Sequence, residues 1–250
     1  MKLNKIEKVI LTLSIALAGL LALPVSANAM HIMEGYLPFG YSIAWSVVCI
    51  PVLVVGVMRL RRLVRDNRRT LILLAMSGAF VFVISSLKIP SVTGSCSHMT
   101  GTGLAAILFG IGTTSILGVI VLVFQAILLA HGGLTTLGAN TFSMAIVGPV
   151  LTVLLYKAGK KLNINKNVSI FIAVALGSLF TYCVTAVQLA LAHPGDIGFG
   201  ASLVQFLGVF APTQLPLSLL EGILTVLVVI GMEKYAAGEL SELSFIEEKV

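Results

Sequence analysis

Long apolar runs, separated by short polar or charged stretches, follow one another along almost the whole chain. Seven of them suit helices that lie in a membrane: 41–58, 70–87, 102–112, 115–130, 141–156, 168–191 and 217–232. A helix needs about 20 apolar residues to cross a bilayer. The third run is short and rich in glycine, so we expect it to be tilted, broken or re-entrant. The pattern predicts an all-α polytopic membrane protein with about seven transmembrane helices.

One further apolar run, 201–211, is too short to cross a bilayer by itself. Pro212 and Pro216 follow it, and proline interrupts helical hydrogen bonding. We therefore expect an interfacial or re-entrant piece at this point.

The composition supports a membrane location. Hydrophobic residues make up 58% of the 250 residues and charged residues only 10%. Soluble domains have roughly a quarter charged residues, so a soluble globule and a disordered chain are both excluded. The net charge of +6 does not indicate nucleic-acid binding, because the basic residues cluster beside apolar runs.

The first 29 residues have the three parts of a secretory signal peptide. Three lysines stand near the start, an apolar run occupies 9–23, and the small residues Ala27-Asn28-Ala29 follow. We predict cleavage after Ala29, which would make Met30 the first residue and His31 the second. The alternative is a retained first transmembrane helix, for which the apolar run is short.

The basic clusters predict which side of the membrane each loop occupies. Lysine and arginine accumulate in cytoplasmic loops. Here they gather after the first and fifth runs and in the tail: Arg59, Arg61, Arg62, Arg65, Arg68, Arg69, Lys157, Lys160, Lys161, Lys166, Lys234 and Lys249. With seven crossings the mature N-terminus is outside and the C-terminus is cytoplasmic. We therefore predict a transmembrane metal-binding domain at 30–232 and a cytoplasmic tail at 233–250, in the cell membrane.

All four histidines fall on the outer side of this topology: His31, His98, His131 and His193. His31 is special because a second-residue histidine is a preformed chelator. The α-amine, the deprotonated amide of His31 and its Nδ1 can close fused rings around one d-block ion. An imidazole from another loop would complete a planar set of four nitrogens, and His98 is the candidate because it suits a borderline ion. We expect His131 and His193 to support the structure or the access of the ion.

Other chemistry has weaker signals. Cys96 and Met99 are alternative soft ligands for copper(I) or zinc. Cys49 and Cys183 are predicted inside spans, so no disulfide framework follows. Glu221 is the exceptional carboxylate within a span, and we expect a buried hydrogen-bond partner rather than a coupling site. No nucleotide-binding or hydrolase motif is visible, so the chain is not expected to be an enzyme.

Several stretches resemble the CbiM/NikM family, the substrate-binding subunits of energy-coupling factor transporters. The first is Met30-His31-Ile32-Met33-Glu34-Gly35-Tyr36-Leu37-Pro38. The second, which looks like the cobalt branch, runs from Ile89 to His98 as IPSVTGSCSH. FQAILLAHGGLTTLGAN at 124–140 and APTQLP at 211–216 add to the resemblance. A small departure is Met99, where the family pattern has proline.

The resemblance implies a seven-helix subunit that captures Co²⁺ or Ni²⁺ outside the cell. It implies the partners CbiN, CbiQ and the ATPase CbiO, with no resident cofactor and with cobalt supplied for cobalamin biosynthesis. By motif match the metal ligands are Met30, His31 and His98.

The chemistry and the resemblance favour different metals. A planar site of four nitrogens favours Ni²⁺ or Cu²⁺, whereas the family branch favours Co²⁺. We expect Co²⁺ as the physiological cargo and Ni²⁺ binding as well. The alternatives are a nickel-specific subunit of the same transporter class and a self-sufficient divalent-metal channel or carrier.

Overall fold

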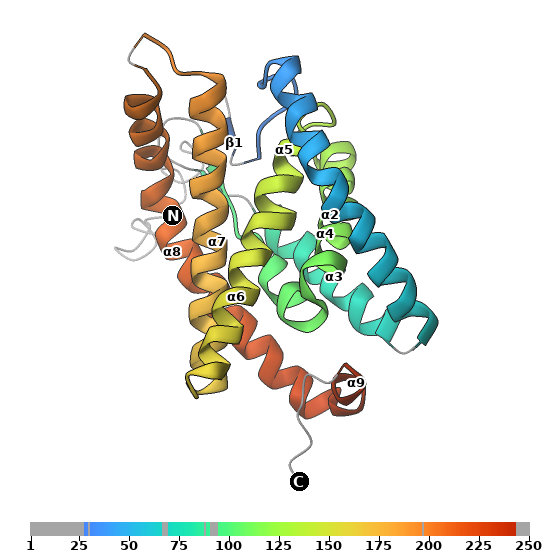
Figure 1. The fold of residues 1–250 in the computed structure, drawn as a ribbon. Coiled ribbons are helices and arrows are strands. Elements are labelled where there is room, and N and C mark those ends of the chain that lie inside the picture. The colour runs from blue at the N-terminus through green and yellow to red at the C-terminus, as the bar shows by residue number, and fades with distance from the viewer. Residues whose placement is uncertain are drawn as a thin grey trace, which may run out of the picture.

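The computed structural model describes residues 28–29, 31–66, 70–87, 89–90, 95–196 and 198–243. Helices dominate it: α2 (Phe39–Asp66), α3 (Thr70–Ser86), α4 (Thr102–Leu129), α5 (Leu137–Asn140), the π-helix η2 (Thr141–Val147), α6 (Gly148–Lys161), α7 (Lys166–Ala192), α8 (Gly198–Tyr235) and α9 (Ala237–Glu242). Figure 1 shows them as one bundle. The prediction of a helical membrane protein is confirmed.

Five helical segments in the described part of the chain are long and apolar enough to cross a membrane. They are Phe39–Arg65, Thr102–Leu129, Leu137–Lys161, Lys166–Ala192 and Gly198–Tyr235, and the shorter apolar helix is Thr70–Ser86. Large apolar side chains such as Val47, Ile72 and Val204 are exposed on their outer faces. Such faces are those of helices surrounded by lipid. The exact number of crossings stays a prediction.

α4 reverses its direction at Gly110, where the backbone leaves helical geometry with φ 75° and ψ 175°. A straight helix of 28 residues would be about 42 Å long. The rings of His98 and His131, which flank its two ends, have centroids only 4.7 Å apart. The few residues between each histidine and the helix cannot bridge that difference, since they reach about 20 Å in all. The third apolar run is therefore broken at Gly110, which is one of the outcomes expected for it, and the start and the end of α4 lie at the same end of the bundle.

α8 is longer than expected. The run 201–211 does not form a separate interfacial piece but continues without interruption through Pro212 and Pro216 into the last apolar run. That expectation was wrong because prolines are tolerated in membrane helices, where neighbouring groups satisfy the carbonyls that they release.

The basic clusters gather at one end of the bundle. In Figure 1 the end of α2, the turn between α6 and α7, and the end of α8 all lie at the bottom, opposite α5. These ends carry the described basic residues of the predicted cytoplasmic loops: Arg59, Arg61, Arg62, Arg65, Lys157, Lys160, Lys161, Lys166 and Lys234. An ion pair of 2.5 Å between Lys166 and Glu233 joins α7 to α8 there. The clustering agrees with the charge pattern, and the side of the membrane stays a prediction.

Three very short strands lie near the other end. β3 (Ser95–Ser97) is central, parallel to β1 (Asn28–Ala29) and antiparallel to β2 (Ile89–Pro90). Ala29, after which we predict cleavage, pairs with Cys96 in this register. β3 thus runs beside the N-terminal segment and leads directly to His98.

Candidate metal centre

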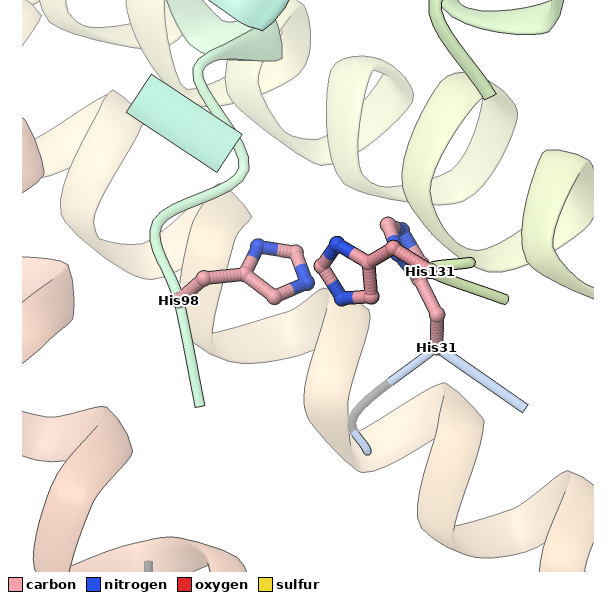
Figure 2. A group of neighbouring side chains, drawn as sticks. All are labelled: His31, His98 and His131. Atoms are coloured by element: carbon pink, nitrogen blue, oxygen red, sulfur yellow. The ribbon is translucent and has the colours of Figure 1, made fainter. Parts of the chain in front are cut away.

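Three histidines that are far apart in the sequence meet in the interior of the protein. His31 comes from the segment before α2, His98 from the segment after β3, and His131 from the turn between α4 and α5. Figure 2 shows their imidazoles converging. One ring nitrogen from each lies within 4.8 Å of the others, and none of the three residues is more than 1% exposed. Imidazole is the commonest metal ligand in proteins, so the group can hold a metal ion.

The chain next to His31 is fixed by hydrogen bonds to α5 and its flank. The backbone N–H of Ile32 donates to Asn140 Oδ1 at 2.9 Å, and Asn140 Nδ2 donates to the Ile32 carbonyl at 3.1 Å. The Thr136 hydroxyl donates to the same carbonyl at 2.5 Å. Because Ile32 is 1% exposed, these bonds satisfy a backbone N–H and a backbone carbonyl that have left water. They hold His31 in one place.

The contacts of His31 also determine which ring nitrogen can bind a metal. Its Nε2 lies 3.1 Å from the sulfur of Met144. A thioether is a weak acceptor and never a donor, so Nε2 carries the proton and the lone pair is on Nδ1. Nδ1 is the nitrogen that can close a chelate ring with the residue's own amide.

His98 has the complementary tautomer. Its Nδ1 lies 2.8 Å from the Met99 carbonyl, which can only accept, so Nδ1 carries the proton. The lone pair of His98 is therefore on Nε2, at the far side of the ring. The Tyr182 hydroxyl of α7 donates to the His98 carbonyl. Such second contacts fix the tautomer and the orientation of metal-binding histidines.

Glu221 of α8 holds the residues that follow His98. Its Oε1 accepts from the Thr100 hydroxyl at 2.6 Å and from the Gly101 N–H at 2.8 Å. Its Oε2 accepts from the Thr100 N–H and from the Ser178 hydroxyl of α7, both at 2.7 Å. The side chain is 1% exposed. The prediction that Glu221 is a buried hydrogen-bond partner is confirmed, and the loop that it binds carries His98.

His131 is held by the end of α4. Its backbone N–H donates to the Gln125 carbonyl at 3.1 Å, and Ala130 before it has a positive φ of 46°. Gly132 follows with φ 78°, and a Cβ on it would lie 3.4 Å from the His31 Cβ. A close approach of this kind favours glycine. The turn therefore places His131 directly beside His31.

The structure brings His31 and His98 together, as the sequence predicts. Met30, the third predicted ligand, lies outside the described residues, as do the side chain of Cys96 and residues 1–27. His131 was expected to support the structure or the access of the ion, and its place in the cluster was missed. A signal was available in the pattern, because His131 ends an apolar run predicted to return to the side of His98.

His193 lies outside the cluster. Its Nε2 is 2.8 Å from the Tyr36 carbonyl, and its ring packs on that of Tyr36 at 4.8 Å. This contact fits the predicted structural role. Cys49 and Cys183 lie in α2 and α7, as expected for residues in spans.

Glu34 is the acidic residue nearest to His31 in the sequence, and it is exposed. A hydrogen bond from the Thr135 side chain, with further bonds from backbone N–H groups, lowers the pKa of its carboxyl below the usual value. The carboxylate joins the segment after His31 to the loop after His131.

Comparisons with known proteins point to one family. Residues 31–238 match the family description "CbiM: Cobalt uptake substrate-specific transmembrane region". The chain is similar to the cobalt transport protein CbiM of Lachnoclostridium phytofermentans, with 59% identity over 245 residues and 98% of each chain covered. It is also similar to the cobalt transport protein CbiM of Clostridioides difficile, with 56% identity over 214 residues, 85% of this chain and 86% of the relative.

Two solved structures have a similar fold. The crystal structure of a truncated transition metal transporter has a TM-score of 0.72 and 27% identity, covering 82% of this chain and 99% of that chain. A second structure of a transition metal transporter has the same TM-score and identity and covers 82% of this chain and 93% of that one.

Proposed function

Because the chain belongs to the CbiM family of cobalt uptake substrate-specific transmembrane proteins, we propose that it captures Co²⁺ at the outer face of the cell membrane. In this proposal it is the substrate-binding subunit of an ATP-driven energy-coupling factor importer. The partners are the coupling subunit CbiQ, the ATPase CbiO and the small membrane protein CbiN. The imported cobalt supplies cobalamin biosynthesis.

The proposed ligands are four nitrogens. They are the α-amine of Met30, the amide and Nδ1 of His31, and Nε2 of His98. The first three form fused chelate rings, and His98 closes the plane. The observation that carries the proposal is the pair of tautomers. Met144 leaves the lone pair of His31 on Nδ1, and the Met99 carbonyl leaves that of His98 on Nε2.

Cleavage after Ala29 is part of the proposal, because it creates the amine. Before cleavage a peptide bond stands in the amine's place, and the nitrogen of a peptide bond has no lone pair to donate to a metal unless it loses its proton. Sequencing the mature N-terminus tests this step. A chain that retains residues 1–29 in the membrane would contradict it.

ATP enters through the partner in this proposal, since no nucleotide motif occurs in the chain. A self-sufficient carrier would need carboxylates within the spans to couple transport to another ion. The exceptional carboxylate there, Glu221, instead accepts four hydrogen bonds from the protein, so this alternative is less well supported. Cargo uptake should therefore require CbiQ and CbiO.

The decisive experiment inserts Ala-Gly between Ala29 and Met30 and measures uptake of radioactive cobalt in cells that contain the partner subunits. Two residues move the amine by up to about 7 Å, whereas a metal–nitrogen bond is about 2.0–2.1 Å. The matched control is Met30→Ala, which changes the side chain but leaves the amine and His31 in position. Intact mass confirms the new N-terminus in each case.

We expect the insertion to abolish uptake and Met30→Ala to transport like the parent. His31→Ala and His98→Ala should also lose uptake, because each removes a ligand of the planar set. If the inserted chain transports like the parent, the amine is not a ligand and the proposed site is wrong.

A further inference from the structure

We propose that His131 is an axial ligand of the cargo metal and that it selects Co²⁺ against Ni²⁺. This inference rests on the proposed function, since it places His131 relative to the planar set of four nitrogens. The observation behind it is the third imidazole, which the structure brings to His31 and His98 from the opposite end of α4.

The geometry needs only a small adjustment to bind one ion with all three rings. Atoms that lie no more than 4.8 Å apart fit within a circle whose radius is about 2.8 Å, so one point lies that close to all three ring nitrogens. Metal–nitrogen bonds are about 2.0–2.1 Å, and three such bonds at right angles place the nitrogens about 2.9 Å apart, so each ring nitrogen must move by about 1 Å. Rotation about side-chain bonds supplies such a movement.

The plane has no position left for His131. In the proposed set, the amine, amide and imidazole of the N-terminal chelate would take three corners of the plane, and His98 would take the fourth. A further imidazole can reach the ion only along the axis above or below the plane. The ring centroid of His131 lies 4.5 Å from that of His31 and 4.7 Å from that of His98, so His131 adjoins both planar ligands.

The axial position separates the two metals. Ni²⁺ has eight d electrons, and with strong planar nitrogen donors it pairs them all and fills the orbital that points along the axis. An axial donor then meets a filled orbital. Co²⁺ has seven d electrons, which leaves that orbital half-filled and able to accept a fifth ligand. A planar site without an axial donor favours Ni²⁺ and Cu²⁺, and the added imidazole shifts the balance towards Co²⁺.

The backbone around His131 fits this role because it is fixed. The bond from its N–H to the Gln125 carbonyl anchors it to α4, and the Gln125 side chain donates to the Ser85 hydroxyl of α3 at 2.7 Å. On the other side, Gly132 packs against His31 and Asn140. The axial ligand is thus attached to the same framework as the chelating segment.

The test uses the full chain with its processed N-terminus, purified metal-free, and titrates it separately with Co²⁺ and with Ni²⁺. For His131→Ala we expect the Co²⁺ affinity to fall by tenfold or more and the Ni²⁺ affinity to change by less than about threefold; a tenfold change is about 1.4 kcal/mol. The absorption bands of bound Co²⁺ should shift because a five-coordinate ion becomes four-coordinate. The matched control is His193→Ala, a histidine outside the cluster, which should leave the ratio of the two affinities and the spectrum unchanged.

His131→Asn keeps a polar side chain of similar size near the turn and serves if the alanine variant does not fold. The proposal is overturned if either folded variant loses Co²⁺ and Ni²⁺ affinity equally, or if neither affinity changes. If the proposed function itself is wrong, a different measurement shows it. In that case the insertion before Met30 would leave Co²⁺ affinity intact, whatever the His131 variants do.

Discussion

Replacing Glu221 with alanine should loosen the loop that carries His98. The carboxylate accepts four hydrogen bonds, two from the backbone N–H groups of Thr100 and Gly101 and two from the hydroxyls of Thr100 and Ser178. Both hydroxyls can turn towards other acceptors, but the two buried N–H groups cannot. An unsatisfied buried donor costs about 1–3 kcal/mol, so we expect a loss of about 2–6 kcal/mol in the free energy of unfolding.

The assay is thermal unfolding of the metal-free protein in detergent, followed by titration with Co²⁺. Tm should fall by at least about 5 °C. Co²⁺ affinity should fall about 10- to 100-fold, as when other groups that orient a metal ligand are lost. Glu221→Gln should have a smaller effect than Glu221→Ala, because it keeps one carbonyl oxygen as an acceptor. Some loss should remain, because its new NH₂ group faces donor groups.

The matched control is Glu233→Gln on the same helix. It removes the ion pair with Lys166, in which both side chains are about one third exposed. Such a pair contributes less than about 1 kcal/mol, so Tm and Co²⁺ affinity should hardly change. If Glu221→Ala behaves like this control in both measurements, the carboxylate does not hold the His98 loop.

Two further changes test the segment around His31. Asn140→Leu removes both hydrogen bonds to the Ile32 peptide, and the unsatisfied N–H should cost about 1–3 kcal/mol in unfolding free energy and weaken Co²⁺ binding in the same titration; unchanged affinity would contradict the anchoring role. Thr135→Val removes the side-chain hydrogen bond that contributes most to lowering the pKa of the Glu34 carboxyl. A lowered pKa in the folded protein stabilises it above the pKa of the unfolded chain, and this stability is lost as pH falls through the folded pKa. The Tm difference between Thr135→Val and the parent should therefore be largest near neutral pH and shrink in acid, where only the lost bond from the Gly35 N–H to the Thr135 hydroxyl remains, and a difference that grows in acid would refute the assignment.

The sequence predicted the features that depend on side-chain pattern. Apolar runs located the helices, and the chemistry of a second-residue histidine selected His31 and His98 as neighbours. A break was one of the outcomes expected for the third run, because that run is short and rich in glycine, and the structure places it at Gly110, where glycine permits the positive φ.

Other features of the fold and of the site depend on tertiary contacts that leave no pattern in the amino-acid sequence. Glu221 binds the backbone of Thr100 and Gly101, and backbone N–H groups are the same in every sequence. α8 continues through Pro212 and Pro216 against their local preference, because neighbouring groups in a membrane protein can satisfy the carbonyls that prolines release. His131 was missed because the apolar run before it specifies a helix but not the exact place where its end meets another segment.

The type of ligand explains how this site can be stable without metal. Carboxylate ligands in an interior with less than 2% exposure would leave uncompensated charges whenever the ion is absent, and buried unpaired charge is costly. His31 and His98 instead offer imidazoles, and in each ring one nitrogen is placed to donate to an acceptor of the protein, Met144 Sδ for His31 and the Met99 carbonyl for His98. A neutral imidazole bears no net charge when the ion is absent, and it still offers a lone pair to a divalent ion. The buried carboxylate near them, Glu221, is turned away to four donors of its own. If the chain takes up and releases an ion as proposed, nitrogen ligands suit that task, and the acidic group, Glu221, instead supports the loop that carries His98.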